Sequence, residues 1–398
     1  MGKYIISWND GNGSIRWAQY DPTIPEPTQH WTNFDINGIG SIDNQSAPQI
    51  ASLYQRRILI VWNKINQQIY SCIIGGNGSP TALETLDWSL MDCKPVTPVR
   101  KGASTSDNPA LCTFGNRAAV AFKGENNQVY YNIFHHNQSN DWDGVRCVKD
   151  GFTNSVPALA FSDESILIAF KGVKDDKRIF YSVDGAAVKE VEDVKTRNVP
   201  ALCSFGKNVL MAWKQEGPNQ EICYSIYDQN SWSKVEPVID AATNMVPVLC
   251  SFNNKVLMTW KGPDEDHKIR YSIYDGDTKN WKNVSCVPVA TTNDVPASAF
   301  AGSSIVIAFK PVDDKQISYH FSGPLHSPDW APITFANNAT SPTITPSLIW
   351  AFLLLAAPIT YESYAHPCKS PYSEIYIYIS PIQKECILLY HSGHPVRP

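Results

Sequence analysis

The sequence is poor in arginine and has no run of basic residues. Its ten arginines are scattered along 398 residues, and the formal net charge is −5. Binding to nucleic acid or to an anionic membrane surface depends on a basic patch or stripe. We therefore predict no nucleic-acid partner and no attraction to a charged membrane.

Long hydrophobic runs are also missing. The apolar stretch at residues 347–359 has some 13 residues, whereas a helix that crosses a bilayer needs about 20. No membrane insertion is predicted. The first residues read as a strand and not as an export signal. We therefore expect a cytoplasmic protein, with release by a non-classical route left open.

Metal-binding cysteine motifs are absent as well. None of the ten cysteines forms a Cys-x-x-Cys or Cys/His pair with zinc-like spacing. Two sets of three occupy equivalent positions of an internal repeat: Cys112, Cys203 and Cys250, and Cys93, Cys147 and Cys286. Equivalent positions lie a whole repeat apart, too far for a disulfide unless they are near an axis. We predict reduced structural thiols, with no metal, no cofactor and no catalytic residue.

The dominant feature of the sequence is that internal repeat. A proline opens each unit at spacings of 61, 48, 43, 47 and 49 residues, at Pro48, Pro109, Pro157, Pro200, Pro247 and Pro296. An aromatic residue ends the second apolar run of each unit, at Trp62, Phe122, Phe170, Trp213, Trp260 and Phe309. A period of about 40–50 residues with four short strands per unit is typical of a β-propeller.

The two ends of the chain supply a further unit. Trp8 stands in a second-strand position with no first strand before it, and Pro346 opens a unit 50 residues after Pro296. We therefore predict an all-β fold, a seven-bladed β-propeller with four antiparallel strands per blade, closed by pairing of the N- and C-terminal strands. The propeller is expected to span residues 1–350, with a closing blade shared by about 1–45 and 342–350. Residues 351–398 are expected to form an atypical tail outside the fold.

The second run of each unit, such as residues 166–170, is apolar without interruption. This predicts a strand covered on both faces. Trp213 and Trp260 end such runs and are expected to pack between blades. Four other tryptophans are expected to hold the turn into the fourth strand: Trp142, Trp232, Trp281 and Trp330. None of the six is predicted to bind a ligand.

Two kinds of polar loop are expected at one end of the ring: those joining second to third strands, and those leading into the next first strand. Lysine, carboxylate and amide groups beside an aromatic residue suit the hydroxyls and apolar face of a sugar. Several such weak sites would bind a multivalent glycan by avidity. The predicted ligand-binding residues are Asn108, Lys123, Asn154, Lys171, Asp175, Asp176, Asn198, Lys214, Asn244, Lys261, Asp264, Asp266, Asn293, Lys310, Asp313 and Asp314. The alternative is that the same residues only form turns and hold loop backbone.

Residues 224–232 and 271–281 resemble stretched versions of the Asp-box turn of sialidase-type propellers. With the Ala-Trp-Lys and Val-Pro-Ala-Leu phrases, they resemble the repeats of microbial seven-bladed propeller lectins, within the wider group of sialidase-like and fucose-lectin-like propellers. The resemblance covers about residues 1–350. It implies binding of small sugars such as fucose in pockets between blades, with glycans or glycoproteins as partners.

A sialidase-like glycoside hydrolase is the main alternative. It would need three arginines around the substrate carboxylate, a tyrosine nucleophile with a carboxylate partner, and an acid. Arg16 and Arg270 are equivalent in the repeat and Arg178 is close in phase, but no arginine triad or asymmetric catalytic cluster is visible. An enzyme is therefore not predicted. A non-catalytic protein-interaction scaffold is a third alternative, and the pattern makes no prediction of oligomeric state.

Overall fold

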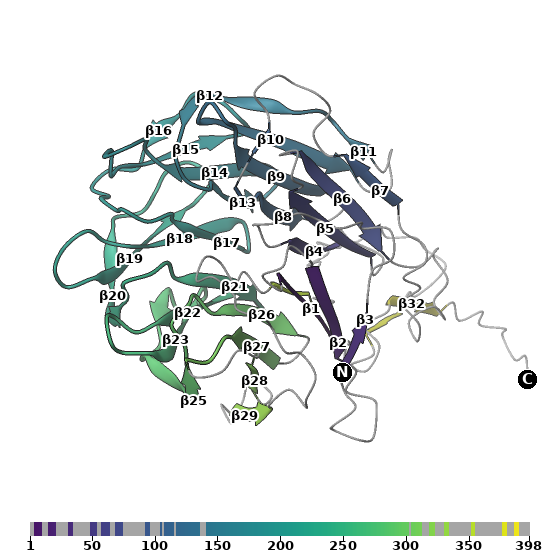
Figure 1. The fold of residues 1–398 in the computed structure, drawn as a ribbon, viewed down its shortest axis with the longest axis vertical. Helices are drawn as coiled ribbons and strands as arrows, with labels where there is room; N and C mark the ends of the chain where they lie inside the picture. The colour runs from purple at the N-terminus through teal and green to yellow at the C-terminus, as the bar shows by residue number, and fades with distance from the viewer. Residues whose placement is uncertain are drawn as a thin grey trace, which may run out of the picture.

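The chain folds as an all-β propeller in a computed structural model (Figure 1). The structure describes residues 4–9, 15–20, 31–34, 48–53, 57–63, 68–74, 92–95, 104–105, 107–114, 117–135, 141–301, 304–312, 318–322, 330–333, 352–354, 376–379 and 386–389. These ranges contain strands and turns without an α-helix. Accordingly, none of them holds a helix long and apolar enough to cross a membrane.

Seven sheets have four or five antiparallel strands each. In six of them, strands that follow one another in the sequence mostly lie next to one another in the sheet. The first three of these six are β4 (Gln49–Leu53), β5 (Arg57–Asn63), β6 (Ile69–Ile74) and β7 (Asp92–Pro95); β8 (Ala110–Phe114), β9 (Arg117–Lys123), β10 (Gln128–His135), β11 (Asp141–Trp142) and β12 (Arg146–Phe152); and β13 (Ala158–Ser162), β14 (Ser165–Lys171), β15 (Ile179–Val183) and β16 (Lys189–Glu190).

The other three are β17 (Ala201–Phe205), β18 (Asn208–Lys214), β19 (Glu221–Tyr227) and β20 (Glu236–Ala242); β21 (Val248–Phe252), β22 (Lys255–Lys261), β23 (Lys268–Asp275), β24 (Asn280–Trp281) and β25 (Ser285–Thr291); and β26 (Ala297–Ala301), β27 (Ser304–Phe309), β28 (Ser318–Ser322) and β29 (Trp330–Ile333). Figure 1 shows these sheets following one another around a ring.

In four sheets the second strand packs against both neighbouring sheets at once. Side chains along a strand alternate between its faces. In β18, Met211 belongs to a core shared with Leu167 of the preceding sheet, whereas Leu210 belongs to a core shared with Met258 of the following sheet. All four side chains are buried. This confirms the prediction that the second strand is covered on both faces.

Five hydrophobic cores of this kind are described, and each joins two sheets that follow one another from β4–β7 to β26–β29. A closed seven-bladed ring would have seven such interfaces, so the five described cores do not cover the whole ring. They do show the propeller architecture, in which each sheet buries its faces against its neighbours.

The tryptophans stabilise these interfaces. Trp213 and Trp260 are 0% exposed, which confirms their predicted place between blades. The Trp232 ring lies 5.7 Å from that of Tyr181 in the preceding sheet, and Trp142 Nε1 donates a hydrogen bond to Ser71 Oγ at 3.0 Å. Tryptophans at the turn into the fourth strand therefore bridge two blades as well as holding their own turn.

The seventh sheet pairs the two ends of the chain. It contains β1 (Tyr4–Asn9), β2 (Ile15–Tyr20), β3 (Trp31–Phe34) and β30 (Phe352–Leu354), with Ile5 opposite Leu354. The predicted C-terminal partner at residues 342–350 lies outside the described residues, and the described partner of β1 is β30, which follows that range. The repeat phrase at Pro346 indicates a further unit but does not show which residues pair with β1. Residues 352–354 are apolar and each has a backbone N–H to donate, whereas Pro342 and Pro346 lack that donor.

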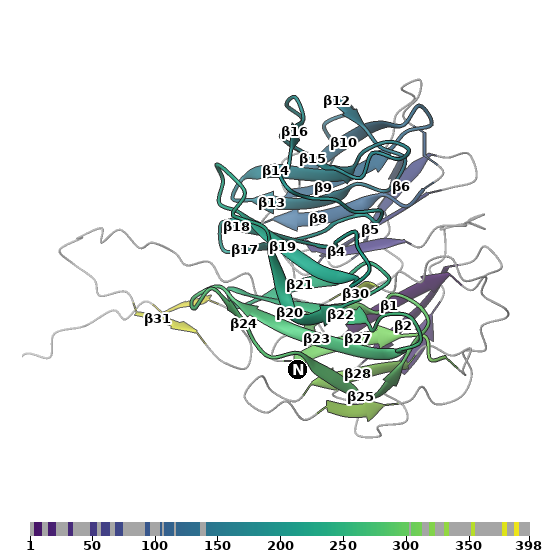
Figure 2. The same ribbon diagram turned by 90° about the vertical axis from the view of Figure 1, so that its left-hand side faces the viewer.

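The remaining strands form a separate two-stranded sheet. β31 (Tyr376–Ile379) pairs with β32 (Cys386–Leu389). Figure 2 shows β31 lying apart from the propeller sheets. The predicted tail of residues 351–398 is thus divided, with β30 inside the closing sheet and the hairpin in a sheet of its own.

The prediction of reduced thiols is correct for several cysteines and wrong for Cys72 and the cysteine bonded to it. Cys112, Cys203 and Cys250 are free, as are the exposed Cys147 and Cys286. Cys72, however, is disulfide-bonded. Cys93 lies directly opposite it in the pairing of β6 with β7. Two cysteines that meet across neighbouring strands of one sheet do not occupy equivalent positions of the repeat, so the repeat does not reveal them.

Candidate functional site

In five units a threonine four residues before the opening proline fixes the loop that leads into the next blade. Thr153, Thr196 and Thr243 are fully buried, and the Oγ1 of each accepts a hydrogen bond at 3.1 Å from the backbone N–H two residues later. Their own N–H groups donate to carbonyls in the second-to-third-strand loop of the preceding blade. The two kinds of loop therefore meet at one end of the sheets. The sequence analysis missed these threonines, although their fixed spacing from the proline could have revealed them.

The predicted asparagines do not share one position. Asn154, Asn244 and Asn293 lie three residues before their prolines and are exposed, whereas Asn198 lies two residues before and is half-buried. Asn108 directly precedes its proline and is 5% exposed. Within the described part of the chain, neither polar atom of the Asn108 side chain has a hydrogen-bond partner. These residues therefore do not form one repeated site.

Two of the predicted lysines turn into their own loops. Lys171 and Lys261 are 5% and 4% exposed. Lys171 Nζ donates to the carbonyl oxygens of Gly172 and Lys174 at 3.0 and 2.9 Å. Lys261 makes the same two contacts in its loop, at 3.1 and 2.8 Å. Both ammonium groups hold loop backbone, so the turn alternative describes these two residues.

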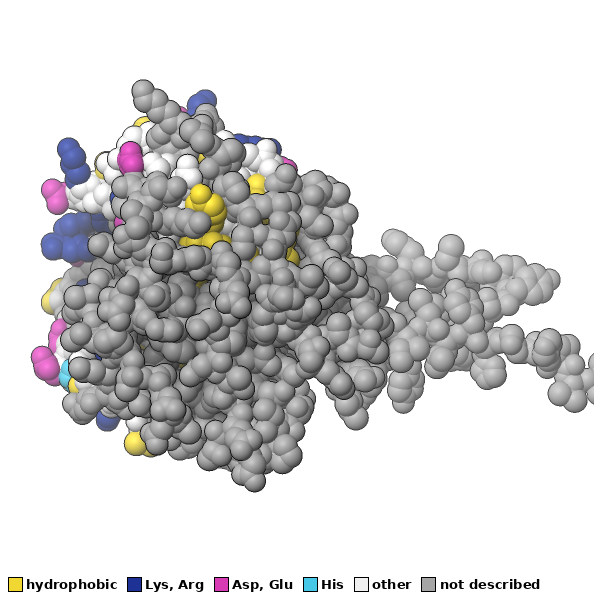
Figure 3. Space-filling view, turned by 45° about the vertical axis from the view of Figure 1, so that its right-hand side comes forward, with side chains coloured by type: hydrophobic (Ala, Val, Ile, Leu, Met, Phe, Trp, Pro, Cys, Tyr) yellow, Lys and Arg dark blue, Asp and Glu magenta, His cyan; other side chains and the backbone are white. Residues whose placement is uncertain are grey.

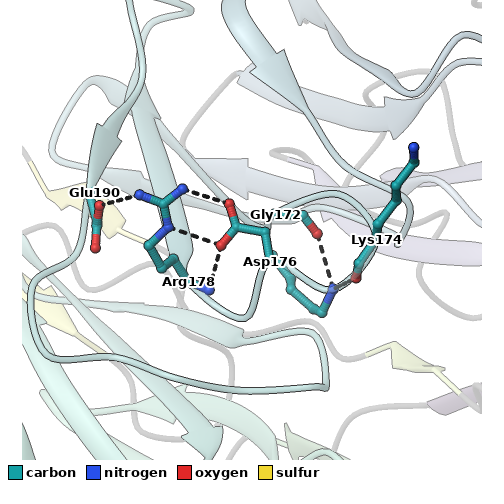
Figure 4. Close-up of polar contacts among 6 residues, drawn as sticks. Gly172, Lys174, Asp176, Arg178 and Glu190 are labelled. Atoms are coloured by element: carbon teal, nitrogen blue, oxygen red, sulfur yellow. Dashed lines mark hydrogen bonds and ion pairs between the residues drawn. The ribbon is translucent and has the colours of Figure 1, made fainter.

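The carboxylates of the same loops pair with arginines. Asp176 accepts hydrogen bonds from Arg178 Nε and Nη2 at 2.9 and 2.8 Å, and Arg178 Nη1 also contacts Glu190 at 3.0 Å (Figure 4). The hydrogen bond from Arg178 holds the pKa of Asp176 below its ordinary value. Asp266 pairs with Arg270 at 2.6 Å. These carboxylates are thus already engaged within the protein.

Other predicted carboxylates are dispersed. Asp175 is exposed. Asp264 accepts hydrogen bonds at 2.9 and 3.1 Å from Gln220 Nε2, which belongs to the loop of the preceding blade. The last pair, Asp313 and Asp314, lies outside the described residues.

Two further predicted lysines face a carboxylate of their own blade. Lys123 Nζ lies 2.7 Å from Asp107 Oδ2. At the equivalent place in another blade, burial raises the pKa of Asp294 and the charge of Lys310 opposes that rise. A lysine at the end of a second strand and an acidic residue two positions before the proline therefore face each other.

One blade has a pocket at this place. The pocket lies between the linker before β17 and the loop after β18, and its volume is about 350 Å³. It takes in two of the predicted residues. The lining residues are Arg197, Asn198, Lys214, Gln215, Glu216 and Gly217.

The pocket exists because its loop cannot close as the equivalent loops do. Gly172 and Gly262 each follow the lysine directly, and a Cβ on them would lie 2.6 and 2.4 Å from the Cγ of an aspartate across the turn. Gln215 stands at the same position, and its Oε1 accepts the Trp213 Nε1–H at 2.7 Å. At Gly217 the loop has a φ of 151°, a conformation that requires glycine. The Glu216 N–H donates to the carbonyl oxygen of Lys195 in the linker at 2.8 Å, so this loop is held against the linker.

The pocket carries more positive than negative charge. Glu216 accepts a hydrogen bond from Lys177 of the preceding blade and from Arg197 Nε, the latter at 3.0 Å. The Lys177 contact, followed by that of Arg197, holds the pKa of Glu216 below its ordinary value. Lys214 adds a further cation to the lining. Figure 3 shows Lys and Arg side chains beside Asp and Glu side chains along the described margin of the molecule.

Metal binding has no support among the described residues, which contain no group of three or more His, Cys, Asp or Glu side chains placed to hold an ion. The arrangement can instead offer hydrogen-bond donors and acceptors to a small polar ligand.

Comparison with known proteins gives a likeness of fold. No family model and no curated protein matches the chain. Among solved structures, the BP39L lectin from Burkholderia pseudomallei is similar, with a TM-score of 0.61 and 11% identity over 84% of this chain and 96% of that one. AofleA from Arthrobotrys oligospora has a TM-score of 0.45 and 9% identity over 72% and 86%. The Aleuria aurantia lectin, described as a six-bladed propeller, has a TM-score of 0.43 and 11% identity over 73% and 97%.

Proposed function

We propose that this propeller is a non-catalytic carbohydrate-binding protein whose partners are glycans or glycoproteins. The observation that carries the proposal is the pocket of about 350 Å³ at Asn198 and Lys214. Its volume is within the range of about 300–1,000 Å³ usual for small-molecule sites. Lysine, arginine, amide and carboxylate groups supply the mixture of donors and acceptors that sugar hydroxyls require.

We propose one binding pocket and not several equivalent sites around the ring. Lys171 and Lys261 hold their own loops, and Lys123 is paired with Asp107. Trp213 lies behind the pocket with its Nε1–H bonded to Gln215. Binding in this pocket therefore depends on polar contacts and not on stacking against an indole ring.

We also propose a closed ring of seven blades. Seven sheets of four or five strands support this count, as does the pairing of β1 with β30. The likeness to the BP39L lectin supports the propeller fold at 11% identity and carries no information about the ligand.

The described arginines support a binding role over hydrolysis. Arg146, Arg178, Arg197 and Arg270 each pair with a different acidic residue or set of acidic residues. Arg117 donates to the carbonyl oxygen of Glu164. A sialidase-like site would need three arginines around one substrate carboxylate.

A glycan array tests the proposed function, run with and without free fucose as a competitor because the sequence resemblance implies fucose. We expect binding to a defined set of glycans and loss of that binding in a Lys214→Met, Asn198→Ala double variant. Silence across the array together with tight binding to a protein would favour an interaction scaffold. Cleavage of a fluorogenic sialoside would favour the hydrolase.

A further inference from the structure

The equivalent lysines of the other blades can be compared with Lys214. In five units a lysine follows the opening proline by 14 positions, and in two of them an acidic residue stands two positions before that proline. In one blade the pair is Lys123 with Asp107, whose charged atoms lie 2.7 Å apart. In the blade with the pocket, the equivalent pair is Lys214 with Asn198. An amide thus replaces the carboxylate that would neutralise the lysine.

The repeat also shows a second way to satisfy this lysine, and Lys214 lacks it as well. Lys171 and Lys261 donate to carbonyl oxygens of a tightly closed loop. That closure needs glycine directly after the lysine, because a Cβ on Gly262 would meet the Asp266 Cγ at 2.4 Å. Gln215 prevents the same closure in the pocket blade.

The one carboxylate of the pocket is already committed. Glu216 pairs with Lys177 and with Arg197. Among the described residues no ion pair within 4.0 Å involves Lys214. The side chains of Lys177, Arg197 and Lys214 are therefore near a single carboxylate, that of Glu216. A partly enclosed lysine ammonium group with no carboxylate of its own favours binding of an anion.

We propose that the pocket binds the carboxylate of an acidic sugar, of the uronic or sialic acid class, against Lys214 Nζ. The ligand carboxylate takes the place that Asp107 occupies against Lys123. The Asn198 amide and the Arg197 guanidinium supply donors for the neighbouring hydroxyl or carboxylate oxygens. This inference rests on the proposed function and names its ligand class.

The charge on the sugar is the variable to test. Titration calorimetry would compare methyl glucuronide and the methyl glycoside of N-acetylneuraminic acid with the neutral methyl glucoside. We expect an acidic sugar to bind at least about tenfold more tightly than methyl glucoside, since a charge-assisted hydrogen bond is worth that factor or more. The preference should weaken as salt is added.

Asn198→Asp is the decisive variant, because it installs the carboxylate that two other blades already carry at Asp107 and Asp294. We expect it to fold normally and to lower the affinity for the acidic sugar about tenfold or more, as Lys214→Gln should. Asn283→Asp is the matched control: it adds the same charge at an exposed position of the following blade, outside the predicted ligand-binding residues, and should leave binding unchanged.

The outcomes separate the inference from the proposed function. Equal affinity for methyl glucuronide and methyl glucoside, or an unchanged affinity in Asn198→Asp, overturns the acidic-sugar inference while glycan binding stands. Absence of binding to every glycan of the array overturns both. Loss of acidic-sugar binding in Asn198→Asp and Lys214→Gln, with Asn283→Asp unaffected, supports the inference.

Discussion

Val289 adopts the same left-handed backbone conformation as Asp240 at the equivalent position of the preceding blade, with φ values of 57° and 60°. Both lie in the outermost long strand of their sheets, where the pairing with the third strand shifts register. Aspartate tolerates this conformation, whereas a β-branched residue is strained in it. Val289 is also 89% exposed, so its side chain gains little from burial.

Replacing Val289 with asparagine should therefore stabilise the protein. We expect the free energy of unfolding to rise by about 1 kcal/mol, measured by chemical denaturation. Ile239→Asn is the control, since Ile239 is 79% exposed without a positive φ and should change stability by less than about 0.5 kcal/mol. Equal effects of the two substitutions would contradict the strain argument.

Two equivalent tryptophans should differ in what their indole N–H contributes. Trp213 and Trp260 are both 0% exposed. The Trp213 N–H donates to Gln215 at 2.7 Å, whereas that of Trp260 has no partner among the described residues. Trp213→Phe should cost about 1 kcal/mol more than Trp260→Phe, because it also leaves Gln215 Oε1 without its donor. Thermal or urea unfolding of the two variants measures the difference, and identical costs would rule this explanation out.

The carboxyl group of Glu216 should titrate below its ordinary pKa of 4.5, because of the hydrogen bond from Lys177 and then that from Arg197. A depressed pKa contributes stability that is present above the unfolded-state pKa and is lost as pH falls through the folded-state pKa. Lys177→Met should raise the pKa of Glu216 towards 4.5, as followed by carboxyl ¹³C NMR. Lys174→Met, in the same loop but exposed, should leave it unchanged. A pKa that does not move in Lys177→Met would refute the assignment.

The cysteines should separate into three classes on alkylation. The exposed Cys147 and Cys286 should react first. Cys203 should react slowly, because burial raises its pKa to about 12 and keeps it from forming the reactive thiolate. Cys72 should stay unmodified until a reductant is added. Timed alkylation followed by peptide mass spectrometry distinguishes the classes, and early labelling of Cys72 without reductant would exclude the disulfide.

Much of the fold was predictable because the same pattern of strands and turns occurs in several units of the sequence. The aromatic residue at the end of each second strand and the uninterrupted apolar run before it indicate a strand between two sheets, and Trp213 and Trp260 lie there. The closing strand was less predictable. Apolar residues 352–354 provide the pairing with β1, and no repeat phrase marks them.

The site was less predictable than the fold, because identical residue types have different tasks in different blades. Lys171 and Lys214 share a position in the repeat, yet one is buried in its own loop and the other lines a pocket. The difference depends on whether glycine or glutamine follows the lysine. The asparagines were grouped by their nearness to proline, although their offsets differ. The threonine four positions before the proline, shared by five units, was the more informative regularity.

Leu210 and Met211 are adjacent in the sequence but support different cores, one shared with Met258 and the other with Leu167. Energetic coupling in this molecule should accordingly be strong between residues one repeat apart and weak between immediate chain neighbours. A destabilising change in one second strand would therefore reach the two flanking units as well as the rest of its own sheet. Loss of structure would then spread around the circle from unit to unit.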